Sequence, residues 1–158
     1  MKKILLFSAM SFILSWASAQ TYVRKNSQTP EQRLNNEYCS GLFQAAEGTV
    51  FDVSSNISAK SYLNILDFLQ GRVAGLQISH QNDGTAIPII RNQRASIYLD
   101  ELPISAGTVN MLSSADIAMI KVIKGPFVGA FGNGGGGVIA IYTLKGDGEE
   151  EEDEASTR

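Results

Sequence analysis

The 158-residue sequence contains a single cysteine, Cys39, and a single histidine, His80. A disulfide within the chain is therefore impossible, and metal sites built from cysteine and histidine lack their ligands. Cys39 is interpreted either as a small apolar residue, which we favour, or as half of a bridge to a partner. His80 precedes Gln81, Asn82 and Asp83, and these polar neighbours predict a solvated loop.

Clusters of basic residues are also missing. Residues 20–146 carry ten basic and nine acidic residues without a basic patch, which disfavours nucleic-acid binding. Seven of the sixteen acidic residues lie instead in 147–154. This stretch can bury no apolar area, so 147–158 is predicted to be a disordered acidic tail. It either keeps the protein soluble or contacts a basic surface on a partner.

Signatures of catalysis are absent from the sequence. A phosphate-binding loop needs Gly-Lys-Ser/Thr opening a helix, whereas Gly132–Gly137 leads into a strand without a lysine. No Gly-x-Ser-x-Gly, no carboxylate pair at a plausible cleft and no Ser-His-Asp order can be defended. We therefore expect no enzyme, no cofactor and no metal site, and a glycine run that serves positive φ angles and close backbone approach.

The N-terminus has the pattern of an export signal. Met1–Ala19 combines Lys2 and Lys3 with an apolar run and ends in Ala-Ser-Ala. The apolar run is shorter than the ~20 residues that span a membrane. A signal peptide is therefore predicted, with cleavage before Gln20.

The next segment, 20–47, is polar and weakly patterned. It predicts a flexible N-terminal arm, in which Thr29-Pro30-Glu31 can start a short helix because proline and glutamate suit the first helical turn. The folded domain is expected to span 48–146.

One helix is predicted in the middle of the chain. Ser61–Val73 places its apolar residues on one helical face. Ser61 is the expected N-cap, and Gly75 the left-handed residue that ends the helix.

Short β-prone stretches surround that helix. They predict strands at 49–53, 76–79, 86–91 and 95–99, a turn at Gln81–Thr85, a loop at Ser105–Asn110 and a helical turn at Leu112–Ile117 capped by Ser113. Pro88 is expected to make its strand an edge strand or irregular.

The chain is organised around Ile117–Lys145. Its β-branched residues predict a strand over 119–124, which Gly125-Pro126 stops. A short apolar helical turn is expected at 127–131, and the glycine run then leads into a second strand over 138–144. We expect a compact crossover to join the two strands.

The stretch Ile117–Lys145 resembles the C-terminal half of the plug domain of TonB-dependent outer-membrane transporters. Leu66–Ile78 and Ser96–Ile104 resemble the helix-to-strand and strand-turn elements of the Bacteroidota members. The residues in matching order are Asp116, Ile117, Ile120, Val122, Ile123, Lys124, Gly125, Pro126, Gly132, Gly137, Val138, Ile139, Thr143, Lys145 and Gly146. The resemblance implies an α+β fold, with a small mixed sheet of about four strands and two or three helices.

The resemblance also implies a function. Such transporters continue into a barrel of at least eight strands of ~10 residues, whereas twelve residues follow Gly146, so we expect a plug without its own pore. It would reach the periplasm and close the periplasmic side or lumen of a separate outer-membrane β-barrel, whose channel wall side chains alone cannot fill. In Bacteroidota, such proteins resemble the closing subunit of the type 9 protein-secretion channel.

Two loops are predicted to contact the barrel, with the arm and the tail as clamps. Their residues are Gln81, Asn82, Asp83, Gly84, Gly132, Asn133, Gly134, Gly135 and Gly136. Two alternatives stay open: a soluble periplasmic binding or signalling module without a pore, and the remnant of a truncated transporter. Coupling to TonB is not supported, because Thr49–Val53 is interpreted as the first strand of the sheet rather than as a segment that pairs with TonB.

The sequence departs from the family pattern at two places. Lys121 replaces a glutamate, and Ile89-Ile90-Arg91-Asn92 replaces an Arg-x-Arg-Gly strand end. Transporter plugs use such charges to lock against their own barrel wall. Their loss indicates a different wall, or none.

Overall fold

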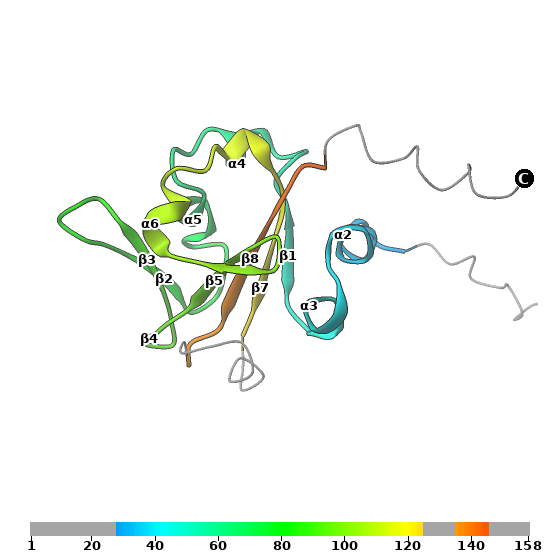
Figure 1. The fold of residues 1–158 in the computed structure, drawn as a ribbon, viewed down its shortest axis with the longest axis horizontal. Helices are drawn as coiled ribbons and strands as arrows, with labels where there is room; N and C mark the ends of the chain where they lie inside the picture. Colours follow the sequence, from blue (N-terminus) through cyan, green and yellow to red (C-terminus); the bar gives the residue numbers. More distant parts are fainter. Residues whose placement is uncertain (1–27, 125–134, 146–158) are drawn as a thin grey trace, which may run out of the picture.

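The computed structural model describes residues 28–124 and 135–145. In these residues the chain forms an α+β fold with two sheets (Figure 1), which confirms the predicted fold class. The predicted signal peptide, the helical turn at 127–131 and the acidic tail lie outside the described residues.

The mixed sheet has five strands, in the order β1 (Thr49–Asp52), β7 (Ile117–Ile123), β8 (Val138–Thr143), β5 (Ser96–Leu99) and β6 (Leu102–Ile104). The antiparallel sheet has three, β2 (Leu76–His80), β3 (Ala86–Ile90) and β4 (Gln93–Arg94).

The two central strands of the mixed sheet, β7 and β8, are antiparallel neighbours. The predicted crossover between them is therefore wrong, since a crossover serves parallel strands and antiparallel neighbours need only a local connection. The parallel partner of β8 is β5. Thr49–Asp52 pairs with β7, which confirms that it is an edge strand of this sheet.

One face of the mixed sheet supports the main core. Three short helices cover it: α4 (Ile57–Lys60), α5 (Ile65–Leu69) and α6 (Ala106–Val109). Every second strand residue points into this core, among them Ile97, Ile120, Val122, Ile139 and Ile141.

The other face lies against α2 (Pro30–Tyr38) and α3 (Gly41–Ala45), which Figure 1 shows on the opposite side of the sheet from α5 and α6. The alternate strand residues point this way, including Met119, Lys121 and Ile123 of β7. Because both faces are covered, β7 is buried along its whole length.

Helix α2 starts where Thr29-Pro30-Glu31 predicted a helix. The Thr29 hydroxyl accepts a hydrogen bond from the Gln32 N–H (3.2 Å), and the Gln32 side chain accepts one from the Thr29 N–H (3.0 Å). This is a capping box, with Pro30 at the first helical position. The segment 20–47, predicted as a flexible arm, thus contains two helices that pack on the sheet. The sequence pattern gave no sign of this packing because α2 buries none of its own residues.

The helix predicted over Ser61–Val73 is much shorter in the structure. Ser61 is the C-cap of α4, and the N-cap of α5 is Asn64, whose side chain accepts from the Leu66 N–H (2.8 Å). Because α5 ends at Leu69, Gly71 rather than Gly75 follows its C-cap with a positive φ (79°). The apolar residues of the predicted face are nevertheless in the core.

Two smaller predictions concern the segment 105–117. Ser105–Asn110 is not a loop, because Ser105 accepts from the Thr108 N–H (3.2 Å) and caps α6. The helical turn capped by Ser113 is confirmed as a short 3₁₀ segment, Ser114–Asp116.

The strand β3 is central in its sheet and pairs with β2 in unbroken register, so the prediction that Pro88 makes it an edge strand or irregular is wrong. Pro88 is tolerated because β4 ends at Arg94, opposite Ile89, and so has no strand residue opposite the proline. The Pro88 carbonyl still accepts a hydrogen bond from the Ala95 N–H (3.0 Å), which follows β4. The missing N–H therefore falls beyond the last paired residue of β4.

Two hairpins turn through two residues without glycine. Arg91 and Asn92 join β3 to β4 at φ angles of 52° and 64°, and Asp100 and Glu101 join β5 to β6 at 46° and 67°. Positive φ at both central residues is the type I′ geometry, which matches the twist of the strands but strains residues other than glycine and asparagine.

Candidate partner interface

The first predicted contact loop is the tip of the β2–β3 hairpin, which projects from the body in Figure 1. Gln81, Asn82, Asp83 and Gly84 are all exposed. The predicted turn is confirmed: the Gln81 N–H donates to the Thr85 carbonyl (3.0 Å). The Asp83 carboxylate accepts from the Thr85 N–H (2.9 Å), and this bond lowers the pKa of Asp83.

This tip is tied to the body of the domain. The Asn110 amide donates to the Gly84 carbonyl (3.5 Å) and accepts from the Asn64 amide (2.5 Å). Directly before the tip, at the end of β2, His80 Nε2 lies 3.1 Å from the Asp67 carboxylate on α5. His80 is thus half-exposed at the end of β2 and in contact with a carboxylate, rather than in a loop.

The second predicted contact loop is only partly described. Gly132, Asn133 and Gly134 lie outside the described residues. Gly135 is exposed, and Gly136 is buried against β4, where its N–H donates to the Arg94 carbonyl (3.4 Å).

The glycines at 135 and 136 allow a close approach of the backbone. A Cβ at Gly135 would overlap the Gln93 side chain, and one at Gly136 would overlap the Gln93 carbonyl and lie 2.9 Å from the Ile90 carbonyl. The expectation of close backbone approach is confirmed for Gly136, which meets backbone atoms, whereas a Cβ at Gly135 would meet only the flexible end of the Gln93 side chain.

The described part of the second predicted loop, Gly135 and Gly136, does not lie beside the first. The Gln81–Gly84 tip precedes β3, whereas Gly136 lies beside Ile90 and Gln93 at the other end of that strand. Five strand residues, at ~3.3 Å each, separate the two loops. Any partner that contacts both must therefore span the small sheet.

The second face of the mixed sheet contains a polar site around Lys121, whose partners no sequence pattern indicated. Lys121 is 2% exposed, and its ammonium group donates to Asn35 Oδ1 (2.5 Å), the Phe43 carbonyl (2.6 Å) and the Gln44 carbonyl (3.4 Å). These three acceptors match the three N–H groups of lysine. Burial lowers the pKa of Lys121.

A second polar contact lies at the edge of this face. Glu101, from the strained β5–β6 turn, accepts from the Ser40 N–H (2.6 Å) and the Ser40 hydroxyl, and the Tyr142 hydroxyl lies 3.3 Å away. Cys39 is buried next to Tyr142, and burial raises the pKa of both groups. Cys39 thus occupies an apolar cluster, as its favoured interpretation predicted.

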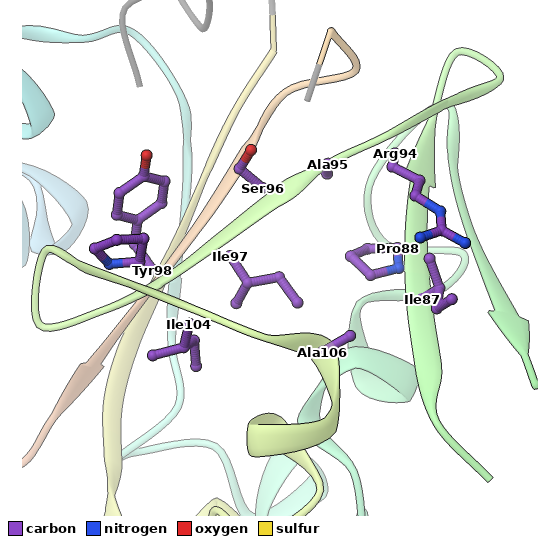
Figure 2. A pocket seen from close by; sticks show the side chains of 10 residues that line it. Ile87, Pro88, Arg94, Ala95, Ser96, Ile97, Tyr98, Ile104 and Ala106 are labelled. Atoms are coloured by element: carbon purple, nitrogen blue, oxygen red, sulfur yellow. The ribbon is translucent and has the colours of Figure 1, made fainter. Parts of the chain in front are cut away.

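An apolar cleft of about 480 Å³ opens between the two sheets. Figure 2 shows Ile97 of β5 and Pro88 of β3 on facing sides of it, with Ile104 and Ala106 along its wall. Arg94 is its one charged lining residue. A cleft of this composition suits an apolar ligand or side chain more than a charged one.

Neither metal ligands nor a membrane span can be recognised in residues 28–124 and 135–145. No group of three or more His, Cys, Asp and Glu side chains is placed there to hold a metal ion. Likewise, no helix in this part of the chain is both long and apolar enough to cross a bilayer.

Comparison with known families identifies the fold. The TonB-dependent Receptor Plug Domain matches residues 48–139, more than half of the chain. The chain belongs to this family. No curated protein has a sequence that matches the chain.

Solved structures of outer-membrane transporters contain a similar plug domain. A chain of the RagAB peptide importer in its open-open state is 26% identical over 64% of this chain, with a TM-score of 0.52. The siderophore receptor PirA from Acinetobacter baumannii (21% identity, 75% coverage, TM-score 0.52) and the ferric enterobactin receptor PfeA from Pseudomonas aeruginosa (a Q482A mutant; 21%, 62%, 0.51) share the fold. This chain spans 12% of the RagAB chain, 19% of PirA and 17% of PfeA.

The family match also divides the chain. It begins at residue 48, so the α2–α3 segment precedes the matched part. The three acceptors of Lys121 therefore all come from outside the part that matches the family.

Proposed function

We propose that this protein is a non-enzymatic plug subunit that closes the periplasmic side or lumen of a separate outer-membrane β-barrel. Its family and its similarity to transporter plugs support the gating role. The partner we propose is the channel of a protein-secretion translocon, with the type 9 system as the specific candidate.

The observation that carries the proposal of a separate barrel is the state of Lys121. The resembled transporters have a glutamate here and lock such charges against their own wall. In this protein, the charge is buried and satisfied by Asn35, Phe43 and Gln44 of the same chain. A plug that covers its own sheet in this way does not need a covalently attached barrel to satisfy its buried charge.

A pull-down tests the proposal directly. The tagged mature protein, purified from outer membranes in mild detergent, is expected to bring one large barrel protein in near-equal amount, identified by mass spectrometry. Deletion of the gene is expected to let large antibiotics through the outer membrane. Recovery of the protein alone from the soluble periplasm, with an unchanged permeability barrier, would contradict the proposal.

The cleft between the sheets favours a second candidate function, a soluble periplasmic binding module. Its apolar lining could hold a small apolar ligand. This candidate predicts that the protein is recovered without a barrel, and that Ala106→Trp, at a half-buried position of the cleft wall, abolishes ligand binding. The plug proposal predicts that Ala106→Trp leaves barrel recovery unchanged.

A further inference from the structure

Helices α2 and α3 cover the second face of the mixed sheet with few fully buried apolar residues. α2 buries none of its residues completely, although Leu34 and Tyr38 are partly buried against the cluster beneath it, and α3 buries only Phe43. The cluster beneath them is small, and it consists of Cys39, Phe43, Tyr98, Met119, Ile123, Val138, Ala140 and Tyr142. Hydrophobic stabilisation scales with the apolar area removed from water, so this face is held less firmly than the main core.

Polar contacts hold the segment at its periphery. Glu101 accepts from Ser40, and the Lys145 ammonium donates to the Glu37 carbonyl (2.8 Å) while lying 5.4 Å from the centre of the Tyr38 ring. These contacts are exposed, and water competes with exposed polar contacts, so each holds the segment by only a modest margin that a single substitution can remove.

The central contact has an unusual composition. Lys121 is buried, yet carbonyl and amide oxygens, rather than a carboxylate, accept its three hydrogen bonds. Burial of a charge without a counter-ion carries a desolvation cost that neutral acceptors offset only in part. When α2–α3 separates from the sheet, the ammonium group regains water and this cost disappears.

We propose that the α2–α3 segment is a releasable clamp, which opens as a unit from the second face of the mixed sheet while the main core stays folded. Few buried apolar contacts and solvent-exposed hydrogen bonds are the features of segments that open locally. The closed clamp buries Lys121, and the open clamp exposes it. The inference concerns the isolated protein and does not depend on the proposed barrel.

The chain contains its own probe of this opening. Cys39 lies between α2 and α3, is 5% exposed and is the only cysteine. A thiol reagent such as DTNB can therefore modify the protein only when the clamp opens or the whole domain unfolds.

The experiment measures the Cys39 labelling rate of the reduced mature protein at increasing urea concentrations. At low urea concentrations, we expect a labelling rate that is nearly independent of urea, because local opening exposes little surface. Near the urea midpoint, we expect labelling to occur through global unfolding, so the rate should then rise steeply with urea. The midpoint itself is measured by circular dichroism. A wild-type rate that follows global unfolding at every urea concentration, or that equals the rate of an unfolded thiol in water, would overturn the proposal.

Variants of the peripheral contact sharpen the test. Glu101→Gln removes the charge that holds Ser40, and we expect labelling without urea to accelerate about fivefold or more while the urea midpoint shifts little. Ser40→Ala, on the clamp itself, gives the same test should Glu101→Gln fail to fold. Glu47→Gln is the matched control, because its side chain makes no hydrogen bond among the described residues. Wild-type labelling rates in both Glu101→Gln and Ser40→Ala would overturn the proposal.

Discussion

At the scale of single residues, Lys121 shows what the sequence could and could not predict. Its departure from the family glutamate was visible, and it indicated a changed environment. Its partners were not predictable, because Asn35 lies 86 residues away and the other two acceptors are backbone carbonyls. A backbone carbonyl is present at every residue, so no sequence pattern distinguishes those that bind lysine.

Lys121→Glu restores the residue type of the family and should displace the clamp. A carboxylate cannot donate to the three oxygen acceptors, and the loss of one partner of a buried charged network costs roughly 3–5 kcal/mol. We expect Cys39 to be labelled at least about a hundredfold faster than in the wild type.

The neighbouring Lys124→Glu is the matched control. The Lys124 ammonium makes one exposed hydrogen bond, to the Ala74 carbonyl (2.9 Å). Labelling should stay near the wild-type rate. Equal rates of Cys39 labelling in Lys121→Glu and Lys124→Glu would show that the buried site of Lys121 does not hold the clamp closed.

The buried thiol of Cys39 makes stability depend on alkaline pH. Burial raises its pKa above the ordinary value of 9.0, so above that pH the unfolded chain loses a proton that the folded protein keeps. Stability is therefore full below about pH 9 and falls as the pH rises. Tyr142, whose pKa burial also raises, adds to this fall at higher pH, whereas the lowered pKa of Lys121 opposes it below pH 10.5.

Cys39→Ala isolates the contribution of the thiol. We expect its urea midpoint to fall less between about pH 8 and pH 10 than the wild-type midpoint does. Chemical denaturation at a series of pH values measures both slopes. Parallel slopes would indicate that the thiol ionises equally easily in the folded and unfolded proteins.

At the scale of elements, apolar pattern predicted what lies in the core better than where each helix ends. The β-branched runs of β7 and β8 gave two strands with boundaries correct to within two residues. The pattern over Ser61–Val73 could not show that Asn64 restarts the helix, because polar N-caps at Ser61 and Asn64 are equally plausible. α6 was missed because its four residues, Ala-Gly-Thr-Val, are too short for a period.

The contact between β4 and the start of β8 depends on the absence of a side chain at Gly136. Gly136→Ala would place a methyl group against two backbone carbonyls, which can move only with their strand. We expect a loss of about 2 kcal/mol or more, as overpacking of a well-ordered region costs roughly 1–3 kcal/mol. Urea denaturation measures the change.

Gly107→Ala is the matched control for this substitution. Gly107 lies within α6, where the nearest atom to a new Cβ would be the Ser105 hydroxyl at 3.8 Å. Alanine is the better helix former, so this variant should gain up to about 1 kcal/mol. Destabilisation of similar size in both variants would argue against a specific close approach at Gly136.

At the scale of the whole molecule, the family, fold class and mixed sheet could be predicted from the motifs in 60–146. The arrangement of the two predicted contact loops could not. Both are glycine-containing segments next to strands, and only the tertiary structure shows that β3 holds Gly84 and Gly136 apart. The packing on the second face was also not predicted, since α2 has only two apolar residues in the i, i+4 relation, Leu34 and Tyr38, which is too weak a pattern to indicate packing.

The hairpin tip is the predicted contact that can be altered without disturbing the fold. Asn82 is exposed, so Asn82→Arg should leave the urea midpoint within about 0.5 kcal/mol of the wild type. If the tip contacts the barrel, recovery of the barrel in the pull-down should fall about tenfold. Ser58→Arg, at an exposed position of α4, serves as control. Equal recovery with both variants would exclude the tip from the interface.

The two strained hairpin turns differ in how much an engineer could gain from them. At Arg91-Asn92, the bond to the rest of the domain comes from the backbone N–H of Arg91 to the Gly75 carbonyl (3.2 Å), which any residue provides. At Asp100-Glu101, the side chains make the bonds: Asp100 accepts from the Thr143 N–H and hydroxyl (both 2.9 Å), and Glu101 accepts from Ser40. Replacing Arg91-Asn92 by Asn-Gly should therefore relieve strain, which would raise the free energy of unfolding by about 1 kcal/mol and the melting temperature with it. The same replacement at Asp100-Glu101 should lower the melting temperature, because it removes the side chains that join this turn to Thr143 and Ser40. Directed evolution for thermostability should therefore find improvements at the first turn and none at the second.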